Sequence, residues 1–152
     1  MNVPIAAAHW LTTGERHPQE IREVWGRGMP ALLRTGIVFD AVRLPAHAVH
    51  QHAGSGRRED VVRAFNETGA GGGAVVVDAA RRWYYALVPP CTAAGWDEPG
   101  TEALGIGCVL GVPAPGRGGP PGSYWLTGPP RGPEGLCAPG AVRVLGALPA
   151  AG

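Results

Sequence analysis

Lysine is missing from this sequence, and all 13 basic residues are arginine. Together with the abundance of alanine, glycine and proline, this bias is typical of a protein encoded by a very GC-rich genome, and it carries little information about function. The formal net charge is only +1. A protein that binds nucleic acid strongly through its phosphates needs a basic face. The near-neutral balance argues against that class.

Serine is also scarce, and the cysteines show no paired spacing. Ser55 and Ser123 are the only serines, and there is no G-x-S-x-G motif, so catalysis by a serine nucleophile has little support. Cys91, Cys108 and Cys137 are odd in number and lack C-x-x-C spacing. This pattern is typical of reduced thiols, and not of a disulfide framework or a zinc site.

Long apolar runs are lacking as well. No stretch approaches the roughly 18–20 residues that a membrane-spanning helix needs. The chain also shows no basic segment followed by the apolar core of a signal peptide. We therefore expect a soluble, cytoplasmic protein with no membrane partner.

What is present favours a folded domain rich in turns. Gly 25 and Pro 16 supply the turns, while 45% hydrophobic residues and five tryptophans supply a core that a disordered chain would lack. The length is that of one domain, residues 1–152. Periodicity predicts helices over residues 4–12 and 18–25, and two more within 46–65. Apolar runs predict strands at 31–33, 37–44, 74–77, 83–88, 107–112 and 124–126, and a strand or helical turn at 142–145.

These elements predict an α+β fold, in which helices pack on a mostly antiparallel sheet. We expect 31–33 and 37–44 to form a hairpin-like pair around Thr35 and Gly36. We also expect 37–44, 74–77, 83–88 and 107–112 to share one sheet.

Three histidines form an H-x-x-H-x-H pattern, at His47, His50 and His52. On a helix the first two share a face, and imidazole is a common zinc ligand. No cysteine or carboxylate close in sequence completes the coordination, so a solvated helix face is the alternative interpretation.

Arg81 and Arg82 run directly into Trp83 and Tyr84. Basic residues beside aromatics on a sheet are typical of proteins that stack bases and hold phosphates of single-stranded nucleic acid. Because alternate residues of a strand face opposite sides, the aromatic residues could equally belong to the core.

Asp40 lies within an apolar strand pattern, where an unpaired charge is costly. Metal-dependent phosphoryl transfer often places two acids at i and i+2 of such a strand, so that both face the ion. Position 42 is Val42, so that pair is missing. A structural aspartate, bonded to arginine or to the backbone, is the alternative.

The order of motifs resembles the N-terminal domain of bifunctional DNA primase/polymerases, the prim-pol family, and in particular its short stand-alone members from high-GC Gram-positive bacteria. The resemblance spans roughly residues 20–148. Its first half is carried by V-W at 24–25, P-A-L-L at 30–33, T-G-I-V-F-D-A-V at 35–42, G-A-V-V at 73–76 and R-W-Y-Y-A-L-V at 82–88. Its second half is carried by G-C-V-L-G-V-P-A-P at 107–115, Y-W-L at 124–126 and G-P-P at 128–130.

The resemblance implies an RRM-like core and, in active members, an acidic pair, a histidine and a third acid. Asp40 matches the first acid, Val42 replaces the second, and Glu102 is the only acid near the third position. Arg81 and Arg82 stand where glycines are usual, and the histidine position falls near Trp83 or Tyr84, so that histidine is missing.

We therefore expect a non-catalytic prim-pol-like domain, an accessory or regulatory module that binds a nucleic acid, a nucleotide or a protein partner, with no cofactor. The alternative is an active primase/polymerase that uses Mg²⁺ or Mn²⁺, with Asp60 or Asp78 supplying acids. A third hypothesis is a metal-binding regulator that uses His47, His50 and His52.

Overall fold

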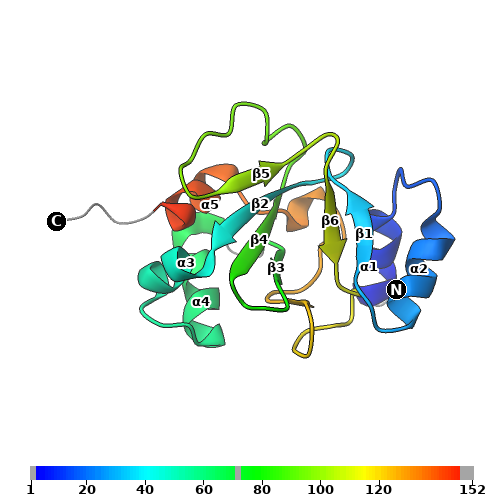
Figure 1. The fold of residues 1–152 in the computed structure, drawn as a ribbon, viewed down its shortest axis with the longest axis horizontal. Coiled ribbons are helices and arrows are strands. Elements are labelled where there is room, and N and C mark those ends of the chain that lie inside the picture. The colour runs from blue at the N-terminus through cyan, green and yellow to red at the C-terminus, as the bar shows by residue number, and fades with distance from the viewer. Residues whose placement is uncertain (1–2, 71–72, 148–152) are drawn as a thin grey trace.

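The computed structural model describes residues 3–70 and 73–147, and within them the chain forms helices and two antiparallel sheets (Figure 1). The helices are α1 Val3–Leu11, α2 Pro18–Gly26, α3 Ala46–Ala53, α4 Arg58–Phe65, the π-helical turn η1 Asn66–Ala70, the 3₁₀ turn η2 Pro133–Gly135, and α5 Pro139–Gly146. The strands are β1 Ala31–Arg34, β2 Asp40–Pro45, β3 Val75–Val77, β4 Trp83–Val88, β5 Glu102–Leu104, β6 Val109–Val112 and β7 Tyr124–Trp125.

The larger sheet has five strands in the order β5-β2-β4-β3-β7, and β1 and β6 form a separate two-stranded sheet. All pairs are antiparallel. The predicted α+β class is confirmed. None of the helices in the described ranges has the length and apolar character required to span a bilayer.

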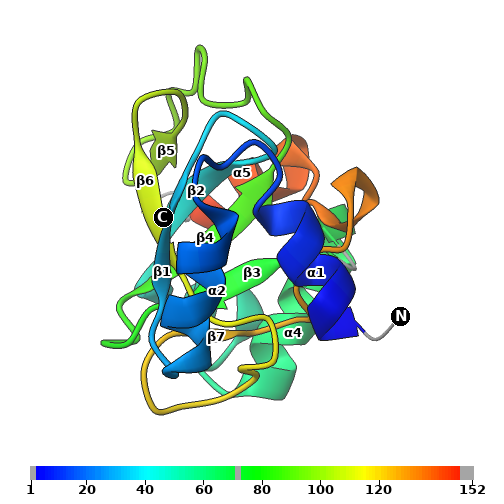
Figure 2. The same ribbon diagram turned by 90° about the vertical axis from the view of Figure 1, so that its right-hand side faces the viewer.

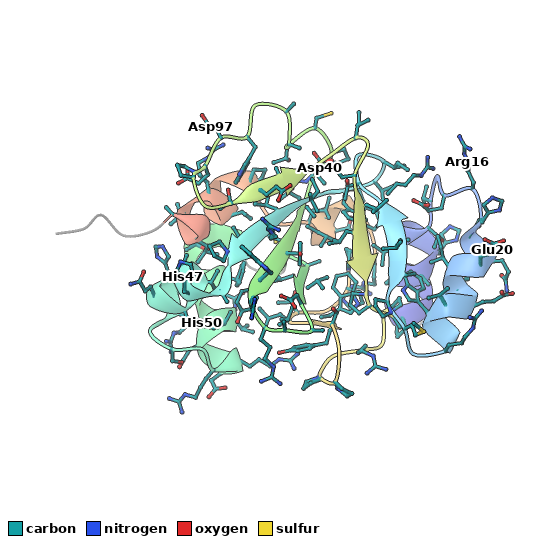
Figure 3. The ribbon with its side chains drawn as sticks, viewed as in Figure 1. Arg16, Glu20, Asp40, His47, His50 and Asp97 are labelled. Carbon is teal, nitrogen blue, oxygen red and sulfur yellow. The ribbon has the colours of Figure 1, made fainter. Side chains whose placement is uncertain are left out.

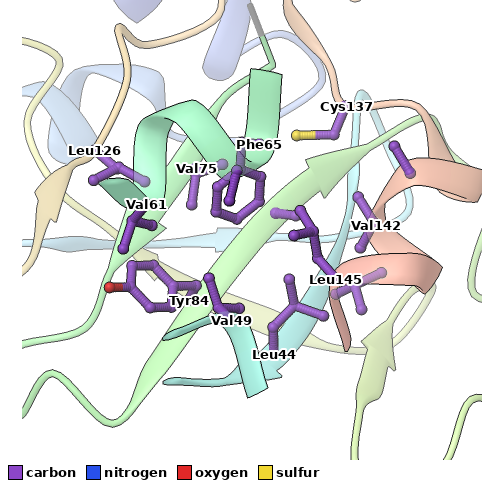
Figure 4. Close-up of a cluster of buried hydrophobic side chains, with 14 of the residues drawn as sticks. Leu44, Val49, Val61, Phe65, Val75, Tyr84, Leu126, Cys137, Val142 and Leu145 are labelled. Carbon is purple, nitrogen blue, oxygen red and sulfur yellow. The ribbon is translucent and has the colours of Figure 1, made fainter. Parts of the chain in front are cut away.

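One face of the five-stranded sheet packs against α3, α4 and α5. Because side chains alternate along a strand, Val42 and Leu44 of β2 point to this face. Tyr84 and Ala86 of β4 join them. Figure 4 shows the cluster, with Phe65 of α4 near its middle and the hydroxyl group of Tyr84 pointing outward from it. The helices therefore bury this face and leave the Tyr84 hydroxyl at its margin.

The other face packs against the N-terminal helices and the β1–β6 ribbon (Figure 2). Ala41, Leu87 and Trp125 belong to this second cluster. Trp25 of α2 ties the two parts together, since its indole N–H donates a hydrogen bond to the carbonyl oxygen of Val112 at 2.9 Å. Both faces of the central strands are thus buried, which explains their nearly continuous apolar sequences.

The sequence assigned strand partners wrongly in two places. Residues 31–33 and 37–44 do not form a hairpin, because β1 pairs with β6 and β2 pairs with β4 and β5. The segment 107–112 therefore leaves the larger sheet, and β5, which the sequence did not predict, takes the place beside β2. The residues at 142–145 belong to a helix, α5.

The turn between β1 and β2 explains why these strands diverge. Gly36 has a φ of +86°, and its N–H donates to the carbonyl oxygen of Phe39 at 2.8 Å. The Thr35 N–H donates to the carbonyl oxygen of Cys108 at 3.0 Å, and the Thr35 hydroxyl donates to that of Gly105. These bonds hold the β1–β2 turn against residues 105–108, which precede β6. The chain therefore passes at this turn from the two-stranded sheet to the five-stranded sheet.

Candidate functional site

The turn between β3 and β4 holds Arg81 and Arg82 in a fixed geometry. The Asp78 carboxylate accepts hydrogen bonds from the backbone N–H groups of Ala80, Arg82 and Trp83, the last at 3.0 Å. Arg81 adopts a φ of +57°, which is uncommon for a residue other than glycine. Asp78 therefore has a structural role in this turn, and the two arginines enter separate cavities.

Arg82 lines the first of these, which we name the aromatic cavity, of about 420 Å³. Its lining residues are Asp78, Ala79, Ala80, Arg82, Trp83, Tyr85, Leu110, Gly111 and Ser123. Trp83 is half-buried, and the Arg43 guanidinium lies over its ring, 4.1 Å from the centroid. Arg43 also pairs with Glu102 at 3.0 Å. Burial raises the pKa of the Tyr85 phenol, so this side chain stays neutral.

Arg81 lines the second, which we name the histidine cavity, of about 340 Å³. Its lining residues are His50, Gly56, Arg57, Arg58, Glu59, Val77, Arg81, Tyr84, Tyr124 and Leu126. The Nε2 atom of His50 lies 2.8 Å from the Tyr84 hydroxyl oxygen. Burial raises the pKa of Tyr84 to about 12. Burial, and secondarily the charge of His47, lowers the pKa of His50.

The four residues predicted to bind nucleic acid therefore do not form one surface. Arg82 and Trp83 line the aromatic cavity, and Arg81 and Tyr84 line the histidine cavity. Tyr84 is only 6% exposed and packs in the helix-covered core. Its ring is not available as an open stacking surface, whereas Trp83 and Tyr85 are partly exposed.

The predicted acidic residues lie apart. Asp40 is 1% exposed, and its Oδ2 atom accepts a hydrogen bond from the N–H of Ala93 at 2.8 Å. By strand alternation it points to the same face as Val42, while Glu102 is paired with Arg43, which points to the opposite face. With Asp78 bound to its own turn, the three acids do not converge.

The three histidines also have separate surroundings. His47 is exposed, His50 contacts Tyr84, and His52 contacts the carbonyl oxygen of Ala147 at 2.9 Å through its Nε2 atom. Figure 3 shows His47 and His50 on α3, away from Asp40 at the start of β2. In residues 3–70 and 73–147, no three histidine, cysteine, aspartate or glutamate side chains gather closely enough to hold a metal ion.

The cysteines are all free thiols. Cys91 is exposed, and Cys137 is buried in the helix-covered core, where burial raises the pKa of its thiol to about 12. A thiol that stays protonated in an apolar core is unreactive. Cys137 therefore has a packing role.

A larger cavity of about 660 Å³ lies between α2 and β1. Ile21 and Leu32 supply apolar surface, and Arg16 and Glu20, both labelled in Figure 3, supply charges of opposite sign. Such a mixed lining points to no particular ligand chemistry. We therefore place the candidate site at the two cavities beside the Asp78–Trp83 turn.

Comparison with known proteins identifies no relative: no family model matches the chain, and neither a curated protein nor a solved structure matches it. The resemblance to the prim-pol family thus stays a prediction from the sequence motifs.

Sequence reasoning missed three arginines of the site, Arg43, Arg57 and Arg58. Arg43 alternates with apolar residues on β2, and this pattern is a signal that it lies on one face together with Glu102 and Trp83. Arg58 gives no comparable signal, because its hydrogen bonds reach Gly118, Trp125 and Leu126, at least 60 positions away.

The His50–His47 pair yields a pH-dependent prediction. His47→Gln should raise the pKa of His50 only part of the way toward its ordinary value of 6.5, because burial, the larger cause, remains. Since the folded state favours neutral His50, its contribution to stability is present above about pH 6.5 and is lost as the pH falls through the lowered value. NMR titration of the imidazole signals measures the pKa. His52→Gln serves as the control, and an equal shift in that variant would contradict the assignment.

Proposed function

We propose that the protein is a non-catalytic binding module that holds single-stranded nucleic acid at the aromatic cavity. The observation that carries the proposal is the meeting of Arg82, Trp83 and Tyr85 in one cavity, beside Arg43. Bases stack on aromatic rings irrespective of sequence, and arginine supplies both phosphate contacts and cation–π contacts. The prim-pol resemblance agrees with this ligand class.

The charge of the chain sets the expected strength of binding. With a formal net charge of +1, and with Arg43 already paired to Glu102, few arginines remain to contact phosphates. We therefore expect modest affinity that depends weakly on salt, with a slope of log K against log salt of about 0.7 for each phosphate contacted on a single strand.

The arrangement of the acids supports a non-catalytic role over an active primase/polymerase. Two divalent ions need several carboxylates that face them together. Asp40 accepts the Ala93 N–H through Oδ2, while its buried Oδ1 has no hydrogen-bond partner among the described residues. Glu102 pairs with Arg43 on the other face, and Asp78 is bonded within its own turn. The described side chains therefore do not fit a Mg²⁺ or Mn²⁺ pair.

Binding to a fluorescently labelled oligonucleotide, measured by anisotropy at several salt concentrations, tests the proposal. Trp83→Ala should weaken binding roughly 5- to 150-fold, the equivalent of ~1–3 kcal/mol for one stacked base, and leave the salt slope unchanged. Arg82→Ala should instead lower that slope by about 0.7. Trp96→Ala is a matched control, because Arg143 lies over the Trp96 ring, 4.4 Å from its centroid, on a different part of the surface.

Two results would overturn this proposal. The absence of binding at low salt, where electrostatic attraction is strongest, would exclude nucleic acid and leave a protein partner as the hypothesis to pursue. Template-directed nucleotide incorporation with Mg²⁺ or Mn²⁺, abolished by Asp40→Ala, would show a catalytic protein.

A further inference from the structure

The histidine cavity contains a positive charge that pairs with no carboxylate of residues 3–70 and 73–147. Arg58 donates hydrogen bonds to three backbone carbonyl oxygens: that of Gly118 at 2.6 Å, that of Leu126 at 3.0 Å and that of Trp125 at 3.2 Å. These neutral acceptors fix the guanidinium in place but leave its full charge. Such a charge is already positioned to attract an anion.

Arg81 adds a second uncompensated charge to the same cavity. Its side chain is exposed, and within the described part of the chain it forms no ion pair. Arg57 also lines the cavity, and its 4.0 Å pair with Glu59 joins two largely exposed groups and contributes little energy. Its second pair, at 3.6 Å, is with Asp60, whose side chain is only 16% exposed. Three arginines thus face one lining carboxylate, that of Glu59.

His50 and Tyr84 supply neutral hydrogen-bond donors. Because the pKa of Tyr84 is raised to about 12, its hydroxyl keeps its proton at neutral pH. When His50 carries its proton on Nε2 and donates it to the Tyr84 oxygen, the Tyr84 O–H is free to donate into the cavity. Phosphate oxygens are strong acceptors and match such a donor.

Helix α4 begins at this cavity and adds its partial positive charge. Gly56, Arg57, Arg58 and Glu59 line the wall where the helix starts. The Arg57 side chain makes no capping hydrogen bond, the Ser55 hydroxyl oxygen accepts the Arg57 N–H at 3.1 Å, and Glu59 and Asp60 are the acidic residues of the first turn. Backbone N–H groups of a first turn favour a negatively charged ligand.

The remaining wall is apolar. Val77, Tyr124 and Leu126 line it, and the Arg58 guanidinium lies 5.6 Å from the centroid of the Tyr124 ring. A cavity of about 340 Å³ lies within the range of small-molecule sites. A ligand that carries a phosphate at one end and an aromatic or apolar group at the other matches both walls.

We infer that the histidine cavity binds a phosphate monoester, with Arg58, Arg81 and Tyr84 holding the phosphate and Tyr124 contacting the ester group. Trp83 and Tyr84 lie on opposite faces of β4, so this site does not depend on nucleic-acid binding at the aromatic cavity. A free mononucleotide and the 5′-phosphate end of a strand share this chemistry.

Calorimetry with adenosine 5′-monophosphate and with adenosine tests the inference. The monophosphate should bind and the nucleoside should bind at least tenfold more weakly, because charged hydrogen bonds to the phosphate are lost. Arg81→Ala should weaken binding of the monophosphate about tenfold or more. This exposed side chain contributes little to the fold, so the variant should keep its structure. Arg22→Ala is the matched control, because this exposed arginine lies on α2 and lines neither cavity, and it should leave the affinity unchanged.

A second measurement separates the two sources of phosphate. A 5′-phosphorylated oligonucleotide that binds more tightly than its 5′-hydroxyl counterpart, with the difference lost in Arg81→Ala, would identify a strand end. Equal binding of the two oligonucleotides, with the monophosphate still bound, would identify a free nucleotide. Equal affinity for adenosine and its monophosphate, or equal effects of Arg81→Ala and Arg22→Ala on monophosphate binding, would overturn the inference.

Discussion

Trp125→Ala should lower the free energy of unfolding by about 3–5 kcal/mol, the range measured when a large buried aromatic side chain is removed. Trp125 is 1% exposed and lies opposite Val76 on the neighbouring strand. It belongs to the cluster between the larger sheet and the N-terminal layer, which consists of α1, α2 and the β1–β6 sheet. Its indole N–H also donates to the carbonyl oxygen of Ala114 at 3.2 Å. Urea unfolding followed by circular dichroism measures the loss.

Leu32→Ala is the control for this variant. Leu32 is 69% exposed, so its removal should change the free energy of unfolding by no more than about 0.5 kcal/mol. Similar losses in the two variants would show that the N-terminal layer does not pack on the sheet as described.

Gly36→Ala should lower the free energy of unfolding by about 2–5 kcal/mol. A side chain at a φ of +86° is strained by about 1–2 kcal/mol, and a Cβ at this position would lie 2.7 Å from the backbone nitrogen of Ile106. Overpacking against backbone adds about 1–3 kcal/mol, because neither segment moves freely. Thermal unfolding measures the effect.

Gly54→Ala separates the two causes. Gly54 has a φ of +85°, but a Cβ there would have no neighbour within 4 Å. That variant should carry only the conformational cost. A loss in Gly36→Ala no larger than in Gly54→Ala would contradict the close approach between the turn and Ile106.

The strand of residues 83–88 could be predicted to the residue, because an apolar run there follows a turn and is ended by two prolines. Its partners could not be, since periodicity tells which residues share a face and not which strands lie side by side. The segment 107–112 shows this limit: its pairing with β1 depends on the Thr35 and Gly36 contacts with residues 105–108.

The candidate site was predictable to a similar extent. The sequence singled out the run from Arg81 to Tyr84, and strand alternation already separates Trp83 from Tyr84. Which of the two faces lies under α3, α4 and α5 depends on long-range packing, and Arg58 is held by carbonyl groups far along the chain. Neither contact is local, so neither leaves a pattern in the sequence.

Because β4 carries Trp83 on one face and Tyr84 on the other, the two cavities depend on a single register between β4 and its neighbours. Shifting that register by one residue would exchange the faces, turning Tyr84 toward the Arg43 side and Trp83 into the helix-covered core. The turn at Asp78 fixes the residue at which β4 begins, because the Asp78 carboxylate accepts a hydrogen bond from the N–H of Trp83. An insertion within this turn should therefore be tolerated less well than one elsewhere in a related chain. The spacing between Asp78 and Trp83 is a feature by which related chains can be recognised.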